Sequence, residues 1–208
     1  METLLDKVVS ALLDLRIVEI GVLPAHVFLC ERDKDILFGK GAFLHDEKPL
    51  AQIGKFASKE RVTLLGKDRS RMEVPVYGPL IKETKVFLTQ LDCSELGLDP
   101  SAGSSVNLEG AAPITLIGPE GRLYLDRGAV LINNTVTMPK RLADRFGLED
   151  KEKVRIRFET EDPATLSDVV VNIDEQSGYL CTIAADIGRV AGIEGTAFGR
   201  IIRRKSPQ

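Results

Sequence analysis

The chain has few of the side chains that most often carry acid–base or metal chemistry. Of its 208 residues, only two are histidine and three are cysteine. The cysteines, Cys30, Cys93 and Cys181, lie far apart and form no CxxC pair. This spacing indicates reduced thiols that pack in the interior, rather than a disulfide framework. Two histidines also leave little room for a mechanism that needs several imidazoles.

A strong charge excess, a long apolar run and a cleavable leader are missing too. The net charge is only −3, which gives no reason to expect nucleic acid as a partner. No stretch approaches the roughly 18 consecutive apolar residues of a membrane span, and no signal-peptide pattern is visible. We therefore expect a cytoplasmic protein that binds neither membrane nor nucleic acid, with no added targeting peptide.

The residues that are present predict a globular, mainly β chain. Hydrophobic residues make up 43% and charged residues 28%, as in ordinary globular proteins. Short runs with period-two alternation, separated by glycine and proline turns, predict strands, and brief helical patterns lie in the connections. The expected fold is mainly β with short α-helices: two related small β-barrel domains plus an N-terminal amphipathic helix.

A repeated hairpin pattern sets the expected domain boundaries. Residues 62–74 and 114–125 share the order of strand, turn and strand, and such internal similarity favours two related halves. We expect a helix over 1–17, a first barrel half over 18–110 and a second over 111–208, with strands free to exchange between halves.

The N-terminal helix has two open interpretations. Leu4, Val8 and Leu12 recur at the spacing of one helical face. That face either closes the core of the domain or docks to another protein.

Two stretches share a pattern that points to a site. In residues 20–29 (IGVLPAHVFL), period-two alternation places His26 and Phe28 on one face of a strand. In residues 129–139 (AVLINNTVTMP), it places Thr135 and Thr137 on one face in the same way. Two such strands could build a shared site, although most of these side chains are unreactive.

Several short segments follow one another in a characteristic order: Val76–Leu80, Lys82–Val86, Asn107–Gly110, Ile114–Gly121, Arg145–Asp150 and Ala191–Gly195. In this order they resemble the PduL-type phosphate propanoyltransferase (phosphotransacylase) family, from the first helix to about Ile202. The resemblance implies two β-barrel domains with a di-zinc site between them. It also implies conversion of acyl-CoA and phosphate into acyl phosphate, typically in bacterial microcompartments.

The resemblance further implies which positions correspond to the family's metal ligands. Its first His-x-His pair falls on His26 and Phe28, and its second on Thr135 and Thr137. Neither a phenylalanine ring nor a threonine hydroxyl replaces an imidazole as a zinc ligand. His26 is therefore the one metal-ligand position that these pairs retain.

The other implied positions are replaced as well. A further ligand histidine of the family falls on Thr182, its ligand glutamate on Phe87, and its phosphate-contacting arginine on Ile81. Two substitutes remain open: His26 with Cys30 and another cysteine as a different metal site, or Lys82 as a phosphate contact. In a strand, Cys181 is expected to face away from the ligand position at Thr182. Lys82 is expected to face away from the phosphate position at Ile81 in the same way.

Two functions are compatible with this sequence. In the first, the chain keeps the barrel scaffold without catalysis and acts as a binding or assembly protein, with a CoA-type ligand, a protein partner or its own copies. No cofactor is expected there, although zinc is not excluded. In the second, the chain is an active phosphate acyltransferase with a rebuilt site, for which the sequence offers no clear nucleophile–base pair.

Overall fold

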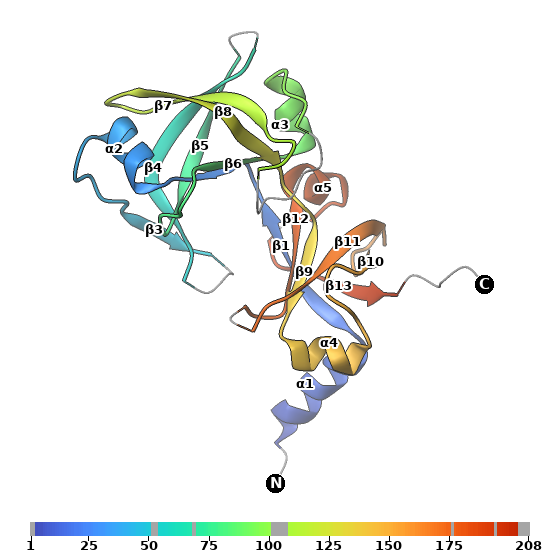
Figure 1. Ribbon diagram of the computed structural model, residues 1–208. Helices are drawn as coiled ribbons and strands as arrows, with labels where there is room; N and C mark the ends of the chain where they lie inside the picture. The colour runs from blue at the N-terminus through green and yellow to red at the C-terminus, as the bar shows by residue number, and fades with distance from the viewer. Residues whose placement is uncertain are drawn as a thin grey trace. The chain divides into compact units, whose positions relative to one another are not determined.

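The computed structural model describes residues 3–50, 54–67, 70–100, 108–175, 177–193 and 195–203. The chain forms two compact units. Unit 1 combines Met1–Leu23 with Asn133–Gln208, and unit 2 is Pro24–Ile132. Each unit is built around a closed six-stranded barrel, so the expected mainly β fold with two related barrels is confirmed (Figure 1).

Unit 2 contains a barrel with one added edge strand. Its elements are β2 (His26–Phe28), α2 (Glu31–Phe38), β3 (Asp46–Pro49), β4 (Phe56–Leu65), β5 (Arg71–Gly78), β6 (Lys85–Leu88), α3 (Gln90–Glu95), β7 (Ala112–Ile117) and β8 (Arg122–Leu131). The sheet runs β3-β4-β5-β2-β6-β8-β7, and a β4–β7 pairing closes it.

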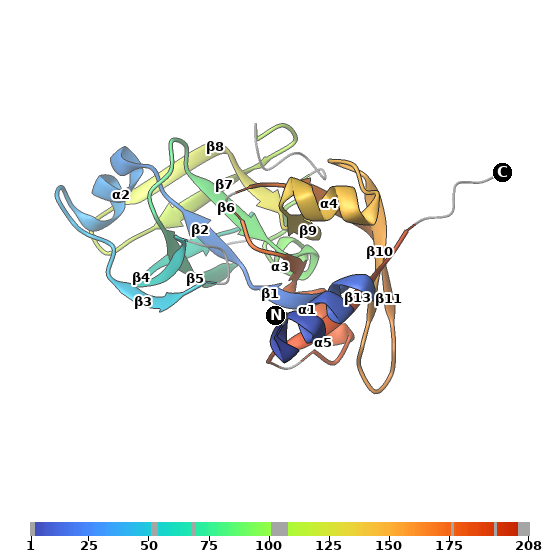
Figure 2. The same ribbon diagram turned by 90° about the horizontal axis from the view of Figure 1, so that it is seen from below.

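Unit 1 takes its barrel strands from both ends of the chain. Its elements are α1 (Leu4–Asp14), β1 (Ile17–Leu23), β9 (Thr135–Met138), α4 (Lys140–Phe146), β10 (Lys153–Phe158), β11 (Thr165–Ile173), β12 (Leu180–Ala184), α5 (Ala185–Val190) and β13 (Ala197–Ile202). The closed order is β1-β12-β9-β11-β10-β13. Figure 1 shows the blue β1 among the orange and red C-terminal strands, and Figure 2 shows the β10–β11 hairpin.

The two barrels have the same pairing pattern. In unit 2, β2 pairs in parallel with β5 and antiparallel with β6, and β6 pairs in parallel with β8. In unit 1, β9 pairs in parallel with β11 and antiparallel with β12, and β12 pairs in parallel with β1. The N-terminal strand β1 therefore fills in unit 1 the place that β8 fills in unit 2.

The two stretches expected as single strands are each divided between the units. Residues 20–29 break at Pro24, which has no N–H for a ladder, so β1 belongs to unit 1 and β2 to unit 2. Residues 129–139 break at Asn133-Asn134, between β8 and β9. The units are thus divided after Leu23 and Ile132, and not at the expected boundaries of residues 17/18 and 110/111.

The repeated hairpin does not mark the two units. Both copies, β4–β5 and β7–β8, lie in unit 2. They pair with each other through β4 and β7, where Leu64 lies opposite Leu116. A hairpin pattern reports local alternation and turn chemistry, which any antiparallel pair of a barrel shares.

Equivalent side chains fill the two cores at the middle strands. In unit 2, Val27 of β2 lies opposite Val76 and Val86, and all three are fully buried. The corresponding set in unit 1 is Val136, Val171 and Cys181, also fully buried. Cys181 therefore takes the place of a valine, and burial raises the pKa of its thiol to about 12. This agrees with a packing role for the cysteine.

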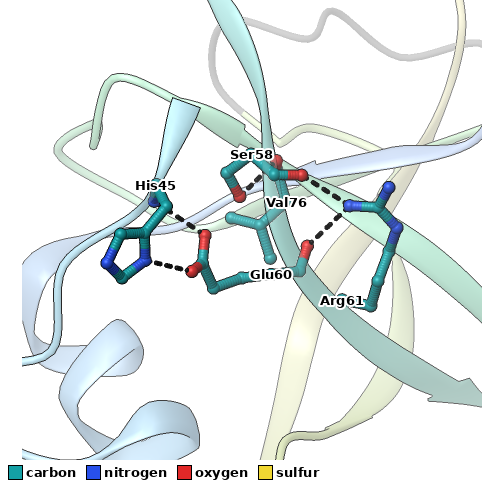
Figure 3. Close-up of polar contacts among 5 residues, drawn as sticks. All are labelled: His45, Ser58, Glu60, Arg61 and Val76. Carbon is teal, nitrogen blue, oxygen red and sulfur yellow. Dashed lines mark hydrogen bonds and ion pairs between the residues drawn. The ribbon is translucent and has the colours of Figure 1, made fainter. Parts of the chain in front are cut away.

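The added strand β3 continues from a histidine that is bound to β4. His45 donates its backbone N–H to Glu60 Oε2 at 2.9 Å, and its Nδ1 lies 2.7 Å from Glu60 Oε1 (Figure 3). The next residue, Arg61, donates to the carbonyl oxygens of Ser58 and Glu60. The His45 side chain is 67% exposed.

The N-terminal helix is confirmed, but much of its apolar face is exposed. Leu13 packs against the core of unit 1, whereas Leu4, Val8 and Leu12 are 80%, 49% and 45% exposed. At the end of α1, Asp14 forms an ion pair with Arg145 of α4. In the part of the chain that the structure describes, no helix combines the length and apolarity needed to cross a membrane.

The strand composition predicts which fragments fold. Residues 24–132 contain every strand of their barrel and should unfold cooperatively when produced alone. Residues 133–208 lack β1 and should not fold until a peptide of residues 1–23 is added, because an open barrel leaves two unpaired edges. Thermal unfolding followed by circular dichroism tests both, with a peptide scrambled over residues 17–23 as control. Cooperative unfolding of residues 133–208 alone would contradict the assignment of β1.

Candidate functional site

The first pair of candidate residues lies on the middle strand of unit 2. Strand β2 runs between β5 and β6, with His26 opposite Phe87 of β6 and Phe28 opposite Tyr77 of β5. Because Val27 faces the core, alternation turns His26 and Phe28 to the other face of the sheet. His26 is nevertheless only 4% exposed, so other side chains cover it.

Aromatic rings cover both faces of the His26 imidazole. The ring of Tyr77 stacks on it at a centroid distance of 4.4 Å and an angle of 17°. The ring of Phe87 stacks on it at 4.9 Å and 9°. Since β5 and β6 flank β2 on opposite sides, the imidazole lies between the two rings.

Phe28 closes this stack from the side. Its ring stands at 82° to His26, 85° to Tyr77 and 85° to Phe87, with centroids 5.6, 5.8 and 6.1 Å apart. Edge-to-face contact of this kind places the positive ring edge against a negative ring face. The Lys55 ammonium lies 5.3 Å from the Phe28 centroid, in the range of a cation–π contact. We call His26, Phe28, Tyr77 and Phe87 the aromatic stack.

The hydrogen bonding of His26 fixes its tautomer. Nδ1 lies 2.8 Å from the carbonyl oxygen of Pro24, and a carbonyl only accepts, so Nδ1 carries the proton. Burial lowers the pKa of His26 to about 4; the bond to Pro24 opposes this shift and the Lys55 charge adds to it. The imidazole is therefore neutral at physiological pH, with its lone pair on Nε2.

The corresponding positions of unit 1 form a hydroxyl pair. Thr135 of β9 lies opposite Thr182 of β12, and their Oγ1 atoms are 2.8 Å apart. Thr182 is only 5% exposed, so this hydrogen bond satisfies a buried hydroxyl. Thr137, two residues along β9, lies opposite Leu180 and Asn172 and is half-buried.

An asparagine holds the start of β9 in place. The Asn134 side-chain oxygen accepts the backbone N–H of Ala184 at 3.0 Å, and its backbone carbonyl accepts that of Val170 at 3.0 Å. These bonds join β9 to β12 and β11 just before Thr135. The position of the hydroxyl pair is therefore fixed by hydrogen bonds of Asn134 to both neighbouring strands.

The six candidate ligand positions divide into two equivalent sets. In unit 2 they are His26, Phe28 and Phe87; in unit 1 they are Thr135, Thr137 and Thr182. The register that places His26 opposite Phe87 also places Thr135 opposite Thr182. Each barrel thus brings its own set together on one middle strand and its antiparallel neighbour.

Comparison with known proteins identifies the family. A model of the phosphate propanoyltransferase family matches residues 19–194. The chain belongs to the phosphate propanoyltransferase family. It is 32% identical over 208 residues to the phosphate propanoyltransferase of Clostridioides difficile, covering 98% of this chain and 100% of that protein. It is 35% identical over 157 residues to that of Thermotoga maritima, covering 75% of each chain, and 30% identical over 209 residues to that of Rhodobacter capsulatus, covering 96% and 97%.

The residues of this family member do not fit a zinc ion in either set. Zinc needs three or four nitrogen, sulfur or carboxylate donors at about 2.0–2.3 Å. In unit 2, His26 Nε2 is accompanied by the phenol of Tyr77, whose pKa burial raises further, and by two rings without donors. In unit 1 the set offers only neutral hydroxyls.

The position predicted to correspond to the family's phosphate contact is apolar as well. Ile81 is half-buried in the segment after β5, and its backbone N–H donates to the Leu29 carbonyl oxygen at 2.9 Å. An isoleucine side chain supplies neither charge nor hydrogen bonds to an oxyanion. Lys82, the substitute left open by the sequence, is exposed.

The cysteine-based metal site finds no support among the described residues. Within them, no group of three or more histidine, cysteine, aspartate or glutamate side chains is arranged to hold a metal ion. Cys93 and Cys181 are buried and Cys30 is half-buried. Two of the three thiols thus lie where packing thiols were predicted, in the cores of separate units.

Three contributors to the site were missed by sequence reasoning. Tyr77 completes the aromatic stack, Lys55 lies over Phe28, and Pro24 accepts from His26. Tyr77 lies in the Val76–Leu80 segment that carried the family resemblance, so its position alone could have drawn attention. Neither Lys55 nor Pro24 has a sequence signal of this kind. Their contacts with Phe28 and His26 depend on the conformation of the segments outside the strands.

The buried, neutral His26 predicts a stability that decreases as the pH is lowered. Its pKa is about 4 when folded and 6.5 when unfolded, so between these values the unfolded state binds more protons. The free energy of unfolding should be fully retained above about pH 6.5 and fall by on the order of 3 kcal/mol towards pH 4. Denaturant unfolding from pH 4 to 7 should show this, and His26→Phe should lack that component. Equal slopes in both proteins would contradict a buried neutral imidazole.

Proposed function

We propose that this member of the phosphate propanoyltransferase family no longer carries out metal-dependent acyl transfer and works as a binding or assembly protein. Its connection to acyl-CoA and acyl phosphate metabolism comes from the family. The proposal places it in the cytoplasm or in a bacterial microcompartment, without a resident metal.

One observation carries this proposal. Among the ligand positions, only His26 offers a donor that zinc accepts, and that imidazole is held between two aromatic rings. In the family's chemistry a metal acts as a Lewis acid on acyl and phosphate oxygens, and such an effect contributes several kcal/mol. The apolar Ile81 at the phosphate position supports the same conclusion.

The residues favour apolar or aromatic partners at this surface over free phosphate. Phe87 is half-buried, and so are Leu80 and Ile81 in the neighbouring segment. A protein partner, another copy of the chain or the apolar part of a CoA-type ligand suits such side chains better than an oxyanion does.

An active phosphate acyltransferase with a rebuilt site is the second candidate. The family model covers residues 19–194, and relatives that are 30–35% identical carry the name phosphate propanoyltransferase. A fold that is retained over this length supports retained substrate binding. The two candidates differ in whether turnover remains.

Turnover and metal content separate the candidates. The purified chain and the Clostridioides difficile relative are assayed side by side for acyl phosphate formed from acyl-CoA and phosphate. We expect kcat/KM at least ~10³-fold below that of the relative, because a missing Lewis acid costs several kcal/mol of barrier. We also expect less than stoichiometric zinc by elemental analysis. Stoichiometric zinc with turnover near that of the relative would establish the second candidate instead.

Restoring the histidines tests the assignment of positions. The variant Phe28→His, Thr135→His, Thr137→His and Thr182→His should bind zinc, measured by elemental analysis after dialysis and by calorimetry. A control with four histidines at exposed positions, Lys59→His, Arg122→His, Arg141→His and Arg189→His, should bind far less. If the restored variant folds but binds no more zinc than this control, the positions have been assigned wrongly.

A further inference from the structure

We infer that the former ligand positions now stabilise the barrels: the aromatic stack joins β2 to β5 and β6 in unit 2, and the threonine pair joins β9 to β12 in unit 1. This deepens the proposed function and rests on its assignment of positions, because it gives those positions a present role. Folding of each barrel is then independent of metal.

The strands concerned need side-chain contacts more than most strands do. β2 has three residues and β9 has four, compared with a typical strand of five or six. So short a strand forms few ladder hydrogen bonds with each neighbour. Contacts between side chains directly opposite one another also stabilise a strand pair.

In unit 2 the contacts span three strands at once. His26 on β2 touches Tyr77 on β5 and Phe87 on β6, and Phe28 contacts all three rings from the side. Both faces of the imidazole are covered, and its N–H is bound to Pro24. The rings of Phe28 and Phe87 carry no donor that could join Nε2 at a metal ion.

In unit 1 the same place in the barrel uses hydrogen bonding. Thr135 and Thr182 lie opposite each other and satisfy each other's hydroxyl at 2.8 Å. Asn134 adds a bond to β12 through Ala184. Aromatic stacking in unit 2 and a hydroxyl hydrogen bond in unit 1 thus join the corresponding pair of strands at equivalent positions. Metal binding would require neither contact.

A double-mutant cycle measures the threonine pair. Thr135→Val and Thr182→Val are close in shape to the original, and each leaves one buried hydroxyl without its partner. Each should lower the melting temperature by about 3–6 °C, whereas the double variant should fall no further than the worse single one. Thr137→Val, on the same strand but outside the pair, is the matched control and should couple to neither. Additive losses would overturn the inference for unit 1.

The aromatic stack is measured in the same way. Phe87→Leu should lower the melting temperature by about 5 °C or more, and Phe87→Tyr, which keeps the ring, by much less. Should Phe87→Leu not fold, Phe87→Tyr and His26→Phe still test the stack. Both keep a stacked ring, so both should keep a melting temperature close to that of the unmodified chain. Equal losses for Phe87→Leu and Phe87→Tyr would show that stacking contributes nothing.

A last experiment measures how the melting temperature of the full, unmodified chain depends on metal. Melting with excess chelator and with one equivalent of zinc should agree within about 1 °C, since a ligand stabilises only if it binds the folded state. Stabilisation by zinc would overturn the inference. If Thr135 and Thr182 show no energetic coupling and the chain has no turnover, the inference fails and the proposed function stands. If the two residues are coupled and the chain turns over acyl-CoA robustly, the proposed function fails and the inference stands.

Discussion

The register of the middle strands β2 and β9 is the constraint on which both barrels depend. In each strand one valine, Val27 or Val136, is fully buried among side chains of the two neighbouring strands. Because side chains alternate along a strand, burial of that valine turns the residues on either side of it to the opposite face. A shift by one residue would bury a threonine or histidine in the core instead. The candidate site positions are therefore set by core packing before any question of chemistry arises.

This separation lets the residues on the outer face of a middle strand vary while the barrel fold persists. The face opposite the core valine tolerates imidazole, phenyl or hydroxyl groups, provided that each is satisfied by its neighbours. The His26 ring is stacked between two others and its Nδ1 is bonded to a carbonyl, and Thr135 is bonded to a second threonine. Both solutions keep the strands paired. Zinc binding by contrast needs several donors on the same few positions, which the packing of the core does not require.

Much of the fold and part of the site could be predicted from the sequence. Alternation located most strands, and it placed His26 with Phe28 and Thr135 with Thr137 on shared strand faces. The place of β1 in the barrel of unit 1 was not predictable, because its partner strand β12 lies more than a hundred positions away in the chain. The hairpin repeat misled for a related reason, since local alternation does not report barrel membership.

The sequence by itself determined the local alternation, the turn positions, the family and the small number of histidines and cysteines. Only the tertiary structure decided that Phe87 and Thr182 are equivalent, that Tyr77 completes a stack around His26, and that two threonine hydroxyls bind each other. The physical reason is that alternation is a property of consecutive residues. Register between strands that are distant in the chain, and the contacts it creates, is fixed only when the barrel closes.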